Sequence, residues 1–138
     1  MAQNTQPIFT RTPHIEWATS AITTANTAKD GTGTVLRVFT ADATNGSYVS
    51  NLVFRAAGTN VATVARVFIN NGLSNATPAN NILFNEITLA ATTLSEVAAT
   101  ANYNLPMNIA LPAGYKINIT IGTNVAAGYY VSAVGGDY

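Results

Sequence analysis

Apolar and polar residues alternate in short segments along most of the chain, and Gly, Asn or Pro separates the segments. A period of two places one kind of side chain on each face of an extended strand, which is typical of a half-buried β-strand. The segments that show this pattern are residues 14–22, 34–41, 48–56, 63–70, 82–89, 103–111, 115–122 and 129–135. The pattern therefore predicts eight strands.

Turn residues between the segments support this division. Asn45-Gly46 predicts a hairpin because both residue types tolerate a positive φ angle, and Asn71-Gly72 ends the fourth segment in the same way. Residues 92–102 are rich in Ala but poor in 3.6-residue periodicity, so the segment is either a short helix or an extended, bulged connection, and the pattern favours a strand or an irregular connection.

Leu111–Gly114 can be read as a sorting or processing tag or as a turn. A tag needs Thr where Ala113 stands, and an apolar membrane segment after it, but the residues that follow alternate. We therefore expect a tight turn that starts the seventh strand. The inward face of that strand is expected to carry Tyr115, Ile117, Ile119 and Ile121.

Eight short strands in 138 residues predict a single all-β domain. Parallel pairing would need crossover helices, and the pattern predicts none. We expect an antiparallel β-sandwich over residues 14–138, with an eight-stranded jelly roll as the first topology and an immunoglobulin-like sandwich as the second. Residues 1–13 contain two prolines and no alternation, which predicts an N-terminal arm.

The motif GTNVA occurs twice, at Gly58–Ala62 and at Gly122–Ala126, each time between two strands. The repeat is either reuse of a convenient turn or a structural pseudo-repeat. In an eight-stranded jelly roll the loops after the third and seventh strands lie at the same end. We therefore predict that the two motifs lie together.

Charged residues make up only 9% of the chain, against a usual value of about 25%. The six basic and six acidic residues are scattered, so no clustered basic face predicts nucleic-acid binding. No apolar run approaches the length of about 18 residues that a membrane span needs, and the first residues do not resemble a secretory signal. We expect no membrane partner. Because Cys is absent, the sequence predicts no disulfide, thiolate metal site or cysteine nucleophile.

Candidate catalytic and metal-binding groups are few. His14 is the only histidine, so a Ser–His–Asp triad or a histidine metal site would depend on it alone, and a structural role is the better interpretation. Asp30–Leu36 resembles a phosphate-binding loop but precedes a strand where that loop needs a helix, which favours a turn. Residues 71–81 contain amides without an acid, which argues against a calcium site. The acids that a glycosidase pair would need show no pairing in the sequence: Glu16, Asp30, Asp42, Glu86, Glu96 and Asp137. We therefore predict no catalytic residue, no cofactor, no metal and no enzymatic activity.

Two further sets of residues could take part in binding. Tyrosines could form a platform for sugar rings or lie at a subunit interface, and alternation places Tyr129 and Tyr130 on opposite faces, so that one of them is in the core. The other tyrosines are Tyr48, Tyr103, Tyr115 and Tyr138. Arg37, Arg55 and Arg66 lie within strands and could pair with acids of a neighbouring copy.

Four stretches together carry a resemblance to a known group: residues 24–60, 65–72 and 111–124, and the terminal Val134–Tyr138. They share a DGTGT opening before a strand, an NGS-containing hairpin, an LPAG turn and a GGDY-type end. The chain resembles small virion structural proteins of tailed bacteriophages from about Thr24 onward. That resemblance implies a jelly-roll domain that decorates or cements a capsid, or that joins a fibre or tail part.

The function expected from this resemblance is structural. It implies a homo-oligomer, with a trimer expected, that contacts the major capsid protein or other virion proteins and is located in the virion after assembly in the host cytoplasm. The neutral, Thr- and Asn-rich composition suits many weak contacts that add up over repeated copies. The alternative is a carbohydrate- or receptor-binding module of a phage fibre or tail. A hydrolase is the weakest of the three hypotheses.

Overall fold

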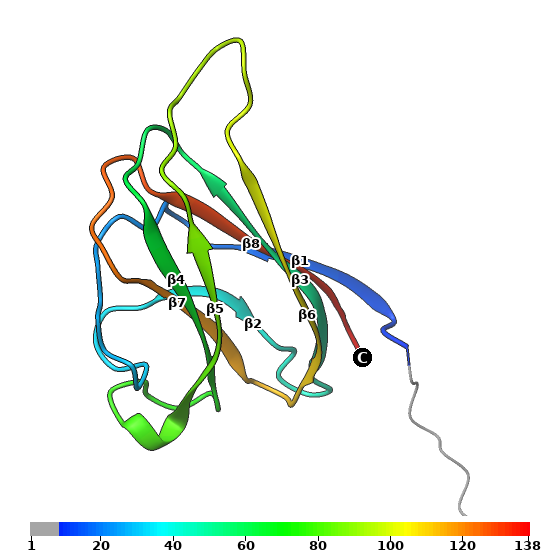
Figure 1. Cartoon of the computed structure of the whole chain (residues 1–138). Helices are drawn as coiled ribbons and strands as arrows, with labels where there is room; N and C mark the ends of the chain where they lie inside the picture. Colours follow the sequence, from blue (N-terminus) through cyan, green and yellow to red (C-terminus); the bar gives the residue numbers. More distant parts are fainter. Residues whose placement is uncertain (1–8) are drawn as a thin grey trace, which may run out of the picture.

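A computed structural model describes residues 9–138, and within them it has eight β-strands and one short 3-10 helix (Figure 1). The strands are β1 (Thr12–Trp17), β2 (Leu36–Thr40), β3 (Ser47–Ala56), β4 (Thr63–Asn70), β5 (Asn81–Leu89), β6 (Asn102–Leu111), β7 (Lys116–Ile121) and β8 (Tyr129–Asp137). The helix is η1 (Pro78–Asn80). Each of the eight predicted strands is confirmed. The described residues contain no helix that is both long and apolar enough to cross a membrane.

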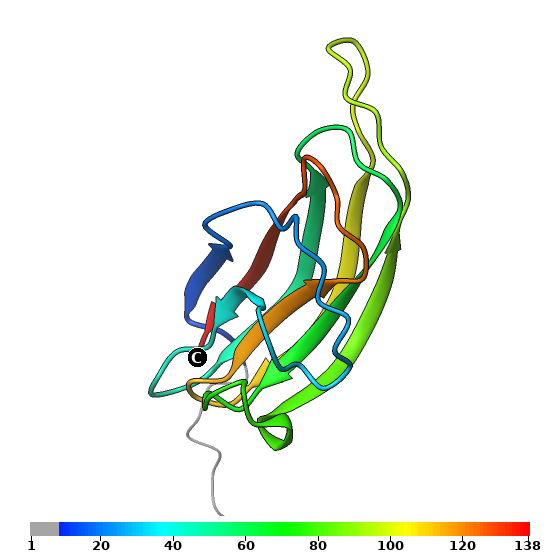
Figure 2. The same ribbon diagram turned by 90° about the vertical axis from the view of Figure 1, so that its left-hand side faces the viewer.

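Two four-stranded antiparallel sheets form a sandwich (Figures 1 and 2). Sheet A has the order β1-β8-β3-β6, and sheet B has the order β2-β7-β4-β5. The pairs β1–β8, β2–β7, β3–β6 and β4–β5 are those of one long antiparallel hairpin whose midpoint lies between β4 and β5. The additional pairs β3–β8 and β4–β7 roll this hairpin into two sheets. This is the jelly-roll topology expected from the sequence.

The core lies between the sheets and is built from the inward positions of the alternating segments. Ile117, Ile119 and Ile121 on β7 are fully buried there, as predicted, and Tyr115 packs against the same core. The outward face of β7 is also buried, because Asn118 and Thr120 lie beneath other parts of the chain. Central strands of a sandwich can therefore be buried on both faces.

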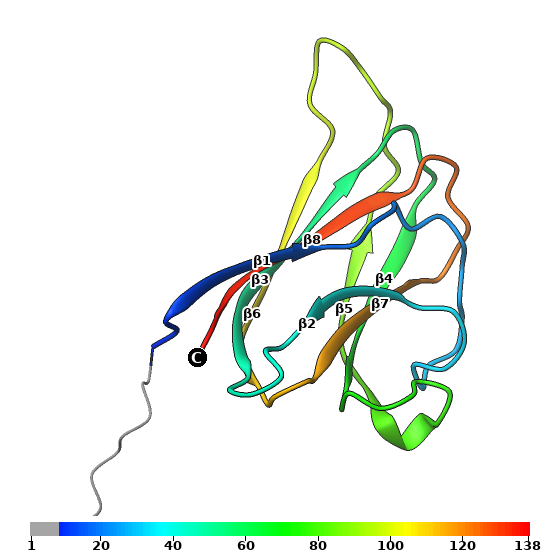
Figure 3. The ribbon, with the colours of Figure 1, turned by 180° about the vertical axis from the view of Figure 1, so that it is seen from behind.

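The predicted and observed strand boundaries differ most at the N-terminal end of the domain. The expected arm included Thr12 and Pro13, but both lie in β1 and pair with β8, and the rest of the expected arm lies mostly outside the described residues. β1 ends at Trp17 instead of residue 22, and Ile22 forms an isolated bridge with Tyr129. The N-terminal and C-terminal strands are neighbours in sheet A, as seen from behind in Figure 3.

The turn at Asn45-Gly46 is present, but the predicted hairpin is wrong. Gly46 has a φ of 77°, yet β2 belongs to sheet B and β3 to sheet A, so the turn crosses between sheets. The turn at Pro112–Tyr115 is confirmed: the N–H of Tyr115 donates to Pro112 O at 3.2 Å, and Gly114 has a φ of 77°. It also joins the two sheets, which explains why turn chemistry alone cannot identify pairing partners.

The two GTNVA motifs lie at the same end of the sandwich, as predicted (Figure 1). Asn60 in the first motif is buried, and its Oδ1 accepts N–H groups from Ala127 and Gly128 directly after the second motif, at 2.9 and 2.8 Å. Its Nδ2 donates to Gly128 O at 2.9 Å. Residues 92–101 form an irregular loop that extends beyond this end, without the helix that the sequence also disfavoured.

Candidate functional site

His14 lies in a polar cluster between the two sheets at the β1 edge. Its Nδ1 donates to Asp137 Oδ1 at 2.7 Å, and its Nε2 lies 3.2 Å from Glu16 Oε2. The imidazole packs on Phe39, with ring centroids 4.4 Å apart. Glu16 Oε2 also accepts the N–H of Thr40 at 2.9 Å, so this carboxylate joins β1 of sheet A to β2 of sheet B. The cluster therefore holds two strands together across the sandwich.

Ser47 belongs to the same cluster, but its connections differ from those of a Ser–His–Asp triad. In a triad the imidazole lies between serine and carboxylate and takes the serine proton. Here Asp137 lies between the two: the hydroxyl of the fully buried Ser47 donates to Asp137 Oδ1, which also accepts from His14. The Ser47 Oγ accepts the N–H of Asp42 at 2.8 Å. These bonds fix the start of β3 and give His14 a structural role.

Asp30 and Asp42 lie in turns, as expected from the sequence. Asp30 Oδ1 accepts from the hydroxyl and the N–H of Thr32, and these hydrogen bonds lower the pKa of Asp30. Asp42 Oδ1 accepts the N–H groups of Asn45 and Thr44, which likewise lower the pKa of Asp42. Both carboxylates therefore stabilise local turns.

The remaining acids are far from one another. Glu86 pairs with Arg66 at 2.8 Å, and Glu96 lies exposed in the protruding loop. The structure brings Glu16 and Asp137 together on two sides of the His14 ring, and Asp42 is joined to the same cluster through its N–H, which donates to Ser47 Oγ. Because the imidazole separates the two carboxylates, these three side chains do not converge on a point, and residues 9–138 contain no group of three or more His, Asp or Glu arranged to hold a metal ion.

The six tyrosines do not form one platform. Tyr129 is fully buried and donates its hydroxyl to Ala90 O at 3.1 Å, while burial raises its pKa. Tyr130 is 58% exposed, which confirms that the two neighbours face opposite sides. Tyr103 accepts the Ala90 N–H at 2.9 Å. Both hydroxyls therefore anchor the loop after β5.

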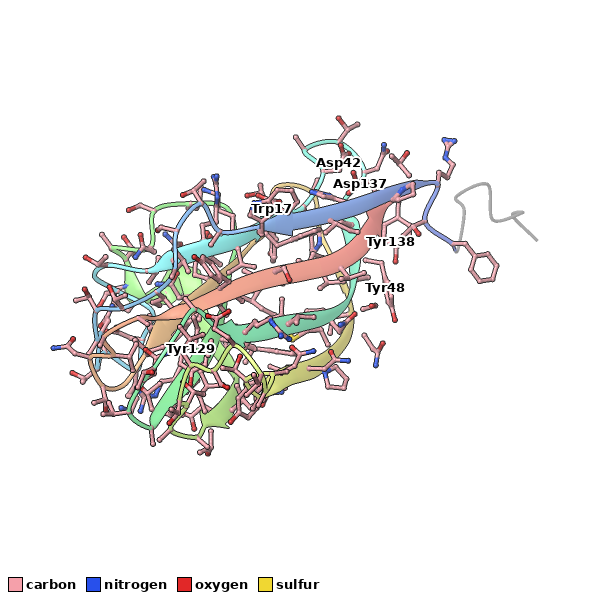
Figure 4. All side chains as sticks on the ribbon, turned by 90° about the horizontal axis from the view of Figure 1, so that it is seen from above. Trp17, Asp42, Tyr48, Tyr129, Asp137 and Tyr138 are labelled. Carbon is pink, nitrogen blue, oxygen red and sulfur yellow. The ribbon has the colours of Figure 1, made fainter. Side chains whose placement is uncertain are left out.

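Tyr48 and Tyr138 are brought together. With Phe9 and Thr10 they line a pocket of about 410 Å³ at one end of sheet A. Figure 4 shows these two tyrosines at the end of the sandwich away from Tyr129. The Tyr48 hydroxyl donates to Asn108 Oδ1 at 3.1 Å. These two tyrosines line a pocket and could therefore stack on a ligand.

The outward face of sheet A combines exposed apolar side chains with uncharged polar ones, among them Asn51, Asn104 and Ser132. Trp17 and Ile15 on edge strand β1 are 67% and 60% exposed, while His14 and Glu16 point inward. Registers place Ile15 beside Val134 and Trp17 beside Ser132. The apolar members of this face are Pro13, Ile15, Trp17, Val53, Pro106, Tyr130 and Val134. Sequence reasoning found the alternation of β1 but not that its apolar residues face outward.

The three strand arginines have different environments. Arg66 forms an ion pair with Glu86 of the same chain, so it needs no acid from a neighbouring copy. Arg55 is the only charged residue at the outward strand positions of sheet A. Arg37 projects from the outward face of sheet B, where it lines a second pocket with Lys116. Neither Arg37 nor Arg55 makes an ion pair within the described part of the chain.

Strand order and pairing define this protein as a jelly-roll β-sandwich. Comparisons with protein-family models, curated proteins and solved structures found no match for the chain. The resemblance to phage virion proteins therefore stays a prediction.

Proposed function

We propose that the protein is a non-enzymatic structural protein of a bacteriophage virion, which decorates or cements the capsid shell as a homo-oligomer. The expected oligomer is a trimer, and the expected further partners are the major capsid protein or other virion proteins. The outward face of sheet A is the single observation that carries this proposal.

This face combines exposed aromatic and aliphatic groups with very little charge. Ile15 is 60% exposed and would gain about 1–2 kcal/mol if contact with another subunit buried it fully, and Trp17 and Tyr130 keep a similar exposed fraction of apolar area to bury. Depletion of charge and enrichment in aromatic residues are typical of the centre of a protein interface. Arg55 is the one charge at these strand positions. The face therefore suits contact with protein better than contact with water.

Edge strand β1 makes the same face a suitable place for self-association. Its exposed side chains lie at the border of the sheet, where β1 has a neighbouring strand on one side only. An exposed edge also offers unpaired backbone groups to a partner. A closed ring of copies would bury both features in each subunit.

The test of self-association is the mass of the protein in solution, measured by sedimentation equilibrium. We expect a trimer for the natural chain and a dissociation constant at least about tenfold higher for Trp17→Ser, because a large apolar group is lost from the interface. Val97→Ser is the matched control, since Val97 is 97% exposed but lies in the loop before β6, which is the edge strand of sheet A opposite β1. A monomer at all concentrations, or equal effects of both substitutions, would contradict the proposed interface.

The test of location is the composition of purified phage particles. We expect mass spectrometry of particles from the phage that encodes this chain to detect it, and electron microscopy to place density of its size on the outside of the shell. Absence of the chain from the particles would exclude a virion role.

A second candidate function is a carbohydrate- or receptor-binding module of a phage fibre or tail. The pocket between Tyr48, Tyr138 and Phe9 supports it, because aromatic faces bind the apolar faces of sugar rings. Loss of binding on a glycan array after Tyr48→Ala, with particles that carry the protein only at the tail, would favour this candidate over decoration.

A further inference from the structure

The outward face of sheet B carries a polar pocket of about 290 Å³ that has no role in the proposed assembly. Three adjacent strands, β2, β7 and β4, form its floor. Registers place Arg37 opposite Asn118 and Asn70 opposite Lys116, so these four side chains share one face of the sheet. The remaining lining residues come from the connections before β2 and after β4: Val35, Gly72, Leu73, Ser74 and Asn75.

The charge of this pocket is entirely positive. Arg37 and Lys116 are two of only six basic residues in the chain, and no carboxylate is among the lining residues. The nearest acid of the adjoining turn, Asp30, has its carboxylate bonded to Thr32. Arg37 makes no ion pair with any described residue, and Lys116 Nζ makes one long bond, to Gly72 O at 3.4 Å. Both cations are therefore available to a ligand.

Asn118 adds an uncharged polar group to the pocket. The residue is only 4% exposed, and its amide makes no hydrogen bond with another described residue. The amide atoms are not among the fully enclosed polar atoms without a partner, so they are open to the pocket. The neighbouring Asn70, which is equally buried, has its amide bonded to Asn81 Oδ1 and to the N–H of Gly72. Asn118 thus lines the pocket with a free donor and a free acceptor.

The wall of the pocket is held rigidly by the Asn-rich loop that follows β4. Asn75 Nδ2 donates to Gly31 O and Gly33 O at 3.2 and 2.8 Å, which docks this loop on the DGTGT turn. Figures 1 and 2 both show the two loops side by side. Asn81 Nδ2 adds a bond to Asp30 O at 3.1 Å. These hydrogen bonds fix the amide of Asn75 through its nitrogen. Its Oδ1 accepts no hydrogen bond among these contacts.

We propose that this pocket binds an acidic sugar, as a single carboxylate-bearing unit. The fork of Arg37 matches the two oxygens of a carboxylate, and Lys116 adds a second positive charge. The amides of Asn118 and Asn75 supply both donors and acceptors, which sugar hydroxyls need and a simple anion does not. Val35 and Leu73 offer apolar contact to a ring. The volume is at the small end of ligand pockets, which fits one ring.

An acidic peptide is the competing occupant, since its carboxylates could pair with the two cations and its backbone groups with Asn118. The small volume of about 290 Å³ favours a single ring over a peptide. The proposed site does not depend on self-association through sheet A, since the pocket lies on the outward face of the other sheet.

The test uses two-dimensional amide NMR on the full chain, titrated separately with galacturonate, galactose, acetate and a short polyglutamate peptide. We expect galacturonate to shift signals of the pocket residues, and the other three to bind at least about tenfold more weakly, because each lacks either the charge or the hydroxyls. Equal shifts with acetate would reduce the pocket to a non-specific anion site. Tighter binding of the peptide, or no binding of galacturonate, would overturn the proposal.

Substitutions locate the site. Arg37→Gln and Lys116→Gln should each weaken galacturonate binding by about tenfold, because each removes a charged hydrogen bond. Arg55→Gln is the matched control, since Arg55 is also an exposed strand arginine without an ion pair but lies on the other sheet. The spectrum of each variant outside the pocket reports whether its fold is intact. Equal weakening by Arg55→Gln would show that net charge, and not this pocket, causes binding.

Discussion

Asn60 shows how one side chain can hold a whole end of the sandwich. Its amide accepts two backbone N–H groups and donates to the carbonyls of Gly58 and Gly128, all in a buried position. The N–H of Asn60 itself also pairs with the loop after β5, through Thr92 O. Asn60 therefore joins three connections that are remote in the sequence, two through its side-chain amide and the third through its backbone.

We expect Asn60→Ala to lower the free energy of unfolding by about 2–4 kcal/mol, because it leaves more than one buried backbone group without a partner. Urea denaturation followed by tryptophan fluorescence measures this. Asn102→Ala is the control: Asn102 is exposed and its amide makes no hydrogen bond in the described structure, so the change should stay within about 0.5 kcal/mol. Equal losses for the two variants would mean that the amide network contributes little.

Residues that meet across the sheets were beyond sequence reasoning. Ser47 and His14 are 90 and 123 positions from Asp137, and nothing in their local patterns indicates a shared hydrogen bond. Alternation also predicts that two sets of residues lie on opposite faces of a strand, but it does not predict which face packs against the core. This is why Trp17 was found to alternate but not to face outward, whereas the opposite faces of Tyr129 and Tyr130 were predicted.

At the scale of elements, the strands were predictable because each alternates and ends at a residue suited to a turn. The sheet to which each strand belongs was less predictable, because the same turn residues occur in hairpins and in turns that cross between sheets. Gly46 and Gly114 show this: both turns join sheet A to sheet B, with identical φ angles of 77°. The two glycines differ only in what surrounds them.

Substitution of these two glycines by Ala distinguishes the cost of backbone strain from the cost of a steric clash. A Cβ on Gly114 would meet nothing within 4 Å, but one on Gly46 would lie 2.4 Å from Leu111 O. Gly114→Ala should therefore cost about 1 kcal/mol for the left-handed conformation alone. Gly46→Ala should cost about 1–3 kcal/mol more, since backbone must move. Thermal and urea unfolding of both variants measures the difference. Equal losses of unfolding free energy in the two variants would show that the turn before β3 shifts to accommodate the added Cβ without a measurable cost.

The whole molecule joins two surfaces of opposite character on its two sheets. The outward face of sheet A carries exposed apolar groups and a single charge, that of Arg55, and the pocket on sheet B holds two cations and no acid. The global topology was predictable because eight strands without crossover helices leave few solutions. The positions of these two surfaces were not, because they depend on which strands become neighbours: Ile15 meets Val134, and Arg37 meets Asn118, only through pairs remote in the sequence.

Salt should act on these two surfaces in opposite directions. Between 0.1 and 1 M NaCl the screening length falls from about 10 Å to about 3 Å, which weakens attraction between exposed charges. Galacturonate binding at Arg37 and Lys116 should therefore weaken several-fold. Self-association through Ile15, Trp17 and Tyr130 should stay constant or strengthen, because it depends on burial of apolar area and not on ion pairs. Sedimentation and NMR titration at both salt concentrations measure the two effects on one sample. If self-association fell with salt in parallel with sugar binding, charge would drive both, and sheet A would not be the interface.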